Sequence, residues 1–175
     1  PVGSVAKISV SDPSNLNSQN LTLAGTAAFN LSGGFTSTGV DWVRVENAVS
    51  TSGASGISIT APWRVWVFAD LTTETGAIAL DGQGNTASWG LGVFLGKGAV
   101  ISTADGDIAI SGKGASPSSP GFNYGVLIAE ASQVVAGGTG NITITATGGA
   151  SPSETNIGFY IREASQVRTE DGDIT

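Results

Sequence analysis

The feature that most constrains this 175-residue chain is a short block of sequence that is copied along it. The pattern Gly-x-Ile-x-Ile/Leu begins at residues 76, 106 and 140, and it starts again at residue 172. A second block, Glu-Ala-Ser-Gln-Val, occupies 130–134 and recurs 33 residues later at 163–167. Copies at such intervals are the signature of repeat proteins, in which each unit packs only against its neighbours.

Each repeat unit contains three short apolar pieces. One unit shows all three: Ile108-x-Ile110, then Val126-x-Ile128, then Val134 alone. Apolar residues alternate with other residues in these pieces, and this period of two is typical of strands rather than helices. Side chains of β-branched residues also suit a pleated, packed surface. The sequence therefore predicts three short strands in each unit.

The N-terminal units fit the same scheme less well. There the pattern predicts a second piece at Ile8 and Val10, a third piece at Leu16, and a first piece at Leu21 and Leu23. In a later unit it predicts the third piece at Val100. Residues 1–38 are therefore expected to form less regular rungs, and residues 39–175 are expected to form clear ones.

The spacing between the pieces separates two all-β architectures. The connections from second to third piece, and from third piece to the next first piece, are nearly constant in length, whereas the first-to-second connection varies. Stacked solenoids tolerate loops at one edge because such loops leave the stack undisturbed. A β-sandwich would need hairpin turns and would not explain the copied blocks. The sequence therefore predicts a three-sided parallel β-solenoid, or β-helix, with insertion loops at one corner.

The repeat also resembles a known family. The patterns Gly-(Asp/Asn/Ala)-Ile-x-Ile-x-Gly-x-Gly, Gly-Val-x-Ile and Val-x-(Thr/Ser)-x-Asp-Gly are similar to repeats of bacterial filamentous-haemagglutinin-like, β-strand-repeat surface adhesins. The resemblance covers about residues 39–175 well and 1–38 loosely. It implies a right-handed parallel β-helix in an exported, extracellular, elongated protein used in adhesion or surface coating. We therefore expect residues 1–175 to be a single solenoid segment of a longer array.

Composition excludes several functional classes. The chain has no Cys, Met or His, which rules out thiol chemistry, Cys/His zinc sites and histidine acid–base catalysis. The chain has only seven basic residues against 14 acidic ones, whereas a protein that binds nucleic acid needs a basic surface. No apolar run approaches the 18 residues of a membrane-spanning helix. No cofactor, nucleic-acid partner or membrane span is therefore expected.

An outward stripe of large residues is the main candidate site. The middle residues of successive second strands are Arg44, Trp66, Phe94, Leu127 and Tyr160. An apolar stripe of this kind should not stand uncovered in water. The long connections carry Trp89, Phe122 and Tyr124, which could fold back over it. The alternatives are lateral contact with another solenoid and stacking on glycan rings.

Acidic residues gather at a second place, the corner before each first strand. Asp105, Asp107, Asp171 and Asp173 flank a glycine there, and Asn141 takes the same position in the unit between. Turn chemistry explains the pattern if the glycine supplies a positive φ and the carboxylates cap the turn. The alternative is a Ca²⁺ ion held between the carboxylate oxygens of these aspartates.

The sequence favours a structural function over catalysis. Glu130 and Glu163 are copies of one repeat position, whereas a catalytic pair is normally unique within an array. We therefore expect a non-enzymatic extracellular surface or fibre protein, a stiff rod that self-associates head-to-tail or laterally or adheres to a host or neighbouring cell surface. The second hypothesis is a glycan-binding adhesin that uses the stripe. A β-helix polysaccharide-degrading enzyme, which needs two carboxylates facing one groove, comes third.

Overall fold

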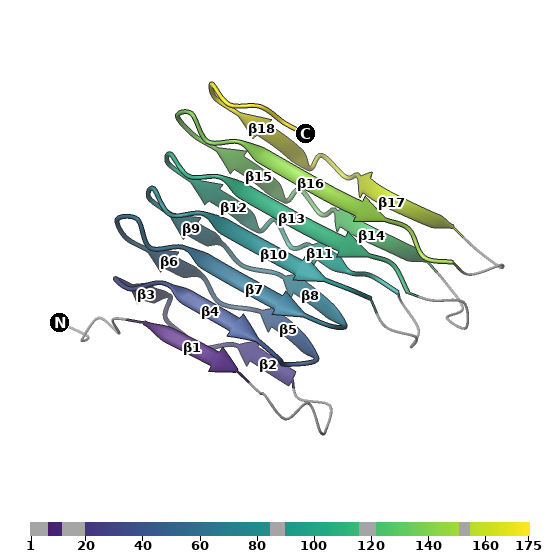
Figure 1. The fold of residues 1–175 in the computed structure, drawn as a ribbon, viewed down its shortest axis with the longest axis horizontal. Coiled ribbons are helices and arrows are strands. Elements are labelled where there is room, and N and C mark those ends of the chain that lie inside the picture. The colour runs from purple at the N-terminus through teal and green to yellow at the C-terminus, as the bar shows by residue number, and fades with distance from the viewer. Residues whose placement is uncertain (1–6, 12–19, 85–89, 116–121, 151–154) are drawn as a thin grey trace.

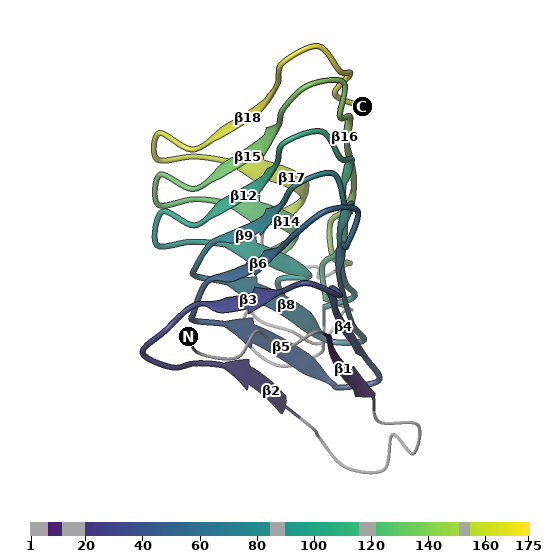
Figure 2. The same cartoon turned by 90° about the vertical axis from the view of Figure 1, so that its left-hand side faces the viewer.

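A computed structural model describes residues 7–11, 20–84, 90–115, 122–150 and 155–175 of the chain. These residues form eighteen strands and no helix. The strands belong to three sheets of six, and every pairing between neighbouring strands is parallel. Each turn of the chain adds one strand to every sheet, so the rungs stack from the N-terminal to the C-terminal end (Figures 1 and 2). The predicted three-sided parallel β-solenoid is confirmed.

The three sheets follow one another along the chain in a fixed order. The first sheet contains β1 (Ile8–Ser11), β4 (Phe35–Thr38), β7 (Ile57–Ala61), β10 (Ile78–Gly82), β13 (Ile108–Lys113) and β16 (Ile142–Thr147). The second contains β2 (Asn20–Leu23), β5 (Trp42–Val45), β8 (Arg64–Val67), β11 (Val93–Leu95), β14 (Asn123–Ile128) and β17 (Asn156–Ile161). The third contains β3 (Phe29–Leu31), β6 (Val49–Thr51), β9 (Leu71–Thr73), β12 (Val100–Thr103), β15 (Gln133–Ala136) and β18 (Gln166–Thr169).

Columns of like side chains fill the interior. In the first sheet, Leu80 of β10 pairs with Ile59 of β7 and Ile110 of β13, and all three are at most 1% exposed. A strand of three to six residues cannot bury its own apolar face, so this burial depends on the rungs above and below. The repeat copies the sequence because each rung must present the same inward residues.

Insertions occur at the connection between the first and second sheets. Only Pro62 and Trp63 separate β7 from β8, whereas 83–92 separate β10 from β11 and 114–122 separate β13 from β14. In a stack of repeats, a connection at one corner can lengthen without moving any strand. The predicted single variable corner is therefore confirmed.

The prediction for the N-terminal rung was wrong. Ile8 and Val10 lie in the first sheet, where Ile8 pairs with Phe35, and Leu21 pairs with Val43 in the second sheet. The strand at Phe35–Thr38 was missed because Ser37 occupies an inward position, where it is completely buried. Period-two alternation marks a strand, but it does not say to which of three sheets the strand belongs.

The prediction at Val100 was wrong by one residue. Ile101, not Val100, pairs with Leu71 and Val134 and is fully buried. Both residues are apolar and β-branched, so the local pattern does not show which of them points inward. A shift of one residue exchanges the inward and outward side chains of a strand. The prediction at Leu16 lies outside the described residues.

Glycines at the corner before each first-sheet strand serve a different purpose from the one predicted. At this corner, positive φ angles occur at Gly34, Gly53 and Gly138, but not at Gly106 or Gly172. A Cβ on Gly106 would lie 2.4 Å from the carbonyl oxygen of Gly76 in the rung below. Glycine recurs there because adjacent rungs approach too closely for any side chain.

Threonine hydroxyls close the same corner from inside. Thr73 and Thr103 are at most 4% exposed, and each donates a hydrogen bond to a backbone carbonyl of the turn, Thr73 to Gly76 at 2.5 Å and Thr103 to Glu74 at 3.1 Å. Thr169 repeats the contact with Gly172 at 2.7 Å. A buried hydroxyl is costly without a partner, so these bonds explain why threonine fits an inward position here.

The copied Glu-Ala-Ser-Gln-Val block forms the turn between the second and third sheets. Glu130 and Ala131 both have positive φ, as do Glu163 and Ala164 in the next rung. The carboxylate of Glu130 accepts a hydrogen bond from the backbone N–H of Lys97 at 2.7 Å. The carboxylate of Glu163 accepts one from the N–H of Glu130 at 3.1 Å. The copied glutamates therefore bond each rung to the one before it.

Candidate functional site

The predicted outward stripe is assembled on the second sheet. Arg44 pairs with Trp66, Trp66 with Phe94, Phe94 with Leu127, and Leu127 with Tyr160. The structure therefore brings all five predicted stripe residues into one column across five strands. The stripe divides into two halves whose side chains have different partners.

Cations cover the aromatic rings in the N-terminal half. The guanidinium of Arg64 lies 5.0 Å from the ring centroid of Trp42 and 4.6 Å from that of Trp66. Burial lowers the pKa of Arg64 below its ordinary value, although the group remains charged at neutral pH. Its Nε makes no hydrogen bond within the described part of the chain. The two indole faces are therefore the contacts that hold this cation.

Phe68 joins the same group from the turn after β8. Arg44 lies 5.1 Å and Lys97 4.9 Å from its ring centroid, and Phe94 meets it edge-on at 5.6 Å. Arg44 also forms an ion pair with Glu46 at 2.5 Å. We call this set the arginine–aromatic cluster: Trp42, Arg44, Arg64, Trp66, Phe68, Phe94 and Lys97.

Sequence reasoning missed Trp42, Arg64 and Phe68. Trp42 and Arg64 form a second column beside the stripe because they are paired in the register of β5 and β8. The signal lay in 63–68, Trp-Arg-Val-Trp-Val-Phe, where Arg64, Trp66 and Phe68 alternate with the inward Val65 and Val67. Cationic side chains of the cluster and neighbouring aromatic rings therefore cover this half of the stripe.

The C-terminal half of the stripe is covered by apolar residues of the long connections. Leu91 and Tyr124 pack with Leu127 and Ala129 into a small hydrophobic cluster outside the second sheet. Leu127 is 5% exposed and Tyr124 is 8% exposed as a result. Of the predicted covering residues, Tyr124 packs here but belongs to β14 rather than to a connection, Phe122 is 44% exposed, and Trp89 lies outside the described residues.

A pocket opens beside this small cluster. The volume of this cavity is about 330 Å³. Its lining residues are Leu91, Phe122, Tyr124, Leu127, Tyr160 and Arg162. The rings of Phe122 and Tyr124 are stacked at 5.7 Å, and those of Tyr124 and Tyr160 lie at 5.6 Å in a tilted arrangement. We call this cavity the tyrosine pocket.

The ionisable groups of the tyrosine pocket favour a neutral phenol beside a cation. Burial, with a smaller contribution from Tyr160, raises the pKa of Tyr124 above its ordinary value of 10.0, and Arg162 opposes the rise. Tyr124 is therefore protonated at neutral pH and can donate a hydrogen bond. Arg162 contacts Glu163 at 3.4 Å, and the side chains of both are nearly half exposed.

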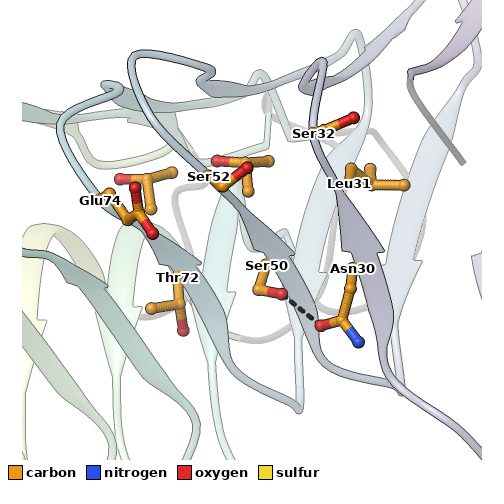
Figure 3. A pocket seen from close by; sticks show the side chains of 9 residues that line it. Asn30, Leu31, Ser32, Ser50, Ser52, Thr72 and Glu74 are labelled. Carbon is orange, nitrogen blue, oxygen red and sulfur yellow. Dashed lines mark hydrogen bonds between the residues drawn. The ribbon is translucent and has the colours of Figure 1, made fainter. Parts of the chain in front are cut away.

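A shallow polar trough lies on the outer face of the third sheet. Asn30, Ser50 and Thr72 stand side by side on β3, β6 and β9, and Ser50 donates a hydrogen bond to Asn30 (Figure 3). Glu74 lines one end, where its carboxylate accepts a hydrogen bond from the N–H of Gly53 at 2.6 Å. The trough measures about 340 Å³ but offers neither a cation nor an aromatic ring.

The aspartates of the predicted calcium corner make hydrogen bonds between rungs. The carboxylate of Asp107 accepts bonds from the backbone N–H and the side-chain amide of Asn141, at 2.8 and 3.1 Å. Asn141 in turn accepts a bond from the N–H of Asp173 at 2.9 Å. Asp105 accepts two bonds from Thr139, and the N–H of Asp171 bonds the carbonyl of Gly138.

These bonds explain the corner without a metal ion. In the part of the chain that the structure describes, no group of three or more acidic residues lies close enough together to hold one. The column Asp107–Asn141–Asp173 instead repeats the arrangement of the glutamate turn, with one side-chain acceptor for each backbone donor.

Comparisons with known proteins identify no relative. No protein-family model, no curated protein and no solved structure matches the chain. Within the described residues there is also no long apolar helix of the kind that crosses a membrane.

Proposed function

We propose that this chain is a rod segment of an exported, non-enzymatic surface protein, in which a stiff stack of rungs carries outer faces used for adhesion or assembly. The observation that carries the proposal is the bonding between rungs at two of the three corners. Glutamates connect successive turns at one corner, and the Asp107–Asn141–Asp173 column connects them at another. Such side-chain bonds supplement the parallel ladders and resist bending between rungs.

The last described strand of the second sheet leaves apolar side chains exposed at one end of the stack. Phe159 and Ile161 are 41% and 37% exposed, whereas their partners one rung earlier, Val126 and Ile128, are completely buried. Within the described residues, β17 and β18 have no partner strand on their outer side and present backbone donors and acceptors there, whereas residues 173–175 already bond to the edge of β16. A second copy that stacks on this end would bury the apolar side chains, and such a head-to-tail contact propagates if it does not close.

Electron microscopy of the purified chain tests the assembly. Filaments or end-to-end rods are expected at high protein concentration, and Ile161→Asp should shorten them because it places a charge on the stacking end. Ala109→Asp, on the exposed outer face of the first sheet and one strand further from this end, is the matched control. Monodisperse single rods at every concentration, with and without added Ca²⁺, would contradict self-association. Filaments only with Ca²⁺ would instead assign a metal to the aspartate corner.

The location of the protein tests the rest of the proposal. Antibodies raised against the chain should label intact source cells, and a protease added outside the cells should remove that label. Labelling that appears only after the cells are made permeable would contradict a surface role. Matched cells that lack the protein provide the control for antibody specificity and for loss of adhesion.

A further inference from the structure

The tyrosine pocket differs from the other concave places that the described residues form. The ring faces of the arginine–aromatic cluster already hold cations, and the trough on the third sheet has no aromatic wall. The tyrosine pocket combines apolar walls, two phenols and one guanidinium. Its volume of about 330 Å³ lies at the small end of the range for ligand sites, which suits one ring rather than a chain.

The walls of the pocket are firmly held. Leu91, Tyr124 and Leu127 are each at most 8% exposed and pack against one another as part of the outer cluster. Tyr160, which is 37% exposed, projects from β17 on the next rung and meets the ring of Tyr124. An exposed aromatic ring beside a buried, packed wall is a preformed surface for a flat apolar face, such as the C–H face of a sugar ring.

Charge narrows the class of ligand. Among the described residues, Arg162 is the one charged residue that lines the pocket, in a protein whose net charge is −7. The fork of terminal nitrogens on a guanidinium matches a carboxylate in a bidentate contact. The contact with Glu163 at 3.4 Å is half exposed to water, so a ligand carboxylate could replace it at little energetic cost. An acidic ligand therefore fits this pocket better than a neutral one.

We propose that the tyrosine pocket binds a single acidic sugar, a pyranose that carries a carboxylate, with its C–H face on Tyr160 and its carboxylate on Arg162. Uronic acids and sialic acids share this chemistry. The pocket adds recognition to the structural role of the rod and does not depend on self-assembly. The neutral phenol of Tyr124 supplies a hydrogen-bond donor for a ring hydroxyl.

Saturation-transfer NMR on the whole chain tests the proposal, with sodium glucuronate, N-acetylneuraminic acid and neutral glucose as separate probes. At least one acid should bind in the millimolar range, about tenfold more tightly than glucose. Whichever acid binds identifies the source of the carboxylate. The affinity should fall as salt is added, because the contact with Arg162 is partly exposed.

Two variants and one control locate the site. Arg162→Gln removes the charge and Tyr160→Leu removes the ring, and each should weaken binding about tenfold. Arg168→Gln, on the exposed outer face of the third sheet, should leave binding unchanged. Circular dichroism confirms that each variant keeps its β-structure. The absence of binding by either acid, equal binding of glucose, or wild-type affinity in Arg162→Gln would overturn the proposal.

Discussion

The close approach of rungs at Gly106 makes a sharp prediction about stability. A Cβ built on Gly106 would lie 2.4 Å from the carbonyl oxygen of Gly76 and 2.8 Å from the hydroxyl oxygen of Thr103. Real Cβ atoms essentially never come within 3.0 Å of another heavy atom. Gly106→Ala must therefore push two rungs apart by roughly 0.6 Å at this corner.

The magnitude follows from what the displacement disturbs. Two ladder bonds begin beside the corner, from Ile78 N–H to the carbonyl of Asp107 at 2.9 Å and from Ile108 N–H to the carbonyl of Asn141 at 2.8 Å. A hydrogen bond contributes about 1 kcal/mol net to stability, and overpacking costs about 1–3 kcal/mol. If the displacement costs the equivalent of one of these two bonds, Gly106→Ala should lower the free energy of unfolding by about 2–4 kcal/mol.

Urea denaturation monitored by tryptophan fluorescence measures the effect. Gly53→Ala is the matched control, because its Cβ would meet nothing within 4 Å while its φ of +59° disfavours any side chain. That variant should cost only about 1 kcal/mol. If Gly106→Ala were no more destabilising than Gly53→Ala, the argument from close rung approach would be refuted.

Three further predictions follow from the corners and the stripe. Arg64→Ala should lower the free energy of unfolding by about 1–2 kcal/mol in the same urea assay, because two exposed-site cation–π contacts are lost. Arg168→Ala, on an exposed face, should change it by less than about 0.5 kcal/mol; equal effects of the two variants would contradict a stabilising contact of Arg64 with Trp42 and Trp66. Glu130→Ala should lower the Tm more than Glu130→Gln, which keeps an acceptor for the N–H of Lys97; the reverse order in a thermal melt would count against the glutamate ladder. The raised pKa of Tyr124 means that folding favours its protonated form, so this contribution to stability is complete below pH 10 and is lost as the pH rises through the folded pKa. Ultraviolet titration should show a late phenolate that disappears in Tyr124→Phe, and an unchanged titration would refute the assignment.

Some of the acidic residues could be interpreted correctly from sequence alone. Glu130 and Glu163 were predicted to be structural because they are copies, and their carboxylates do bond adjacent turns. The glycine of the aspartate corner was predicted to supply a positive φ, and the structure shows a steric requirement instead. Both requirements select glycine, so the residue type alone does not distinguish them.

The stripe shows a similar limit. Its five residues could be aligned because each is the middle residue of a copied strand, but Trp42 and Arg64 became neighbours only through the register of β5 and β8. The tyrosine pocket also requires Leu91 and Phe122, which flank two different connections, to meet Tyr160 of a third rung. The connections vary in length and contain no repeated pattern, so these contacts between residues of different rungs could not be predicted from the sequence.

The sequence by itself determined the parallel three-sided stack, because the period of two marks strands and the copied corners require equivalent rungs to lie above one another. The tertiary structure alone decided the sheet to which β1 and β2 belong, and the inward residue of β12. The physical reason is that alternation is a property of one strand, whereas sheet membership and register depend on the neighbouring strands against which its side chains pack.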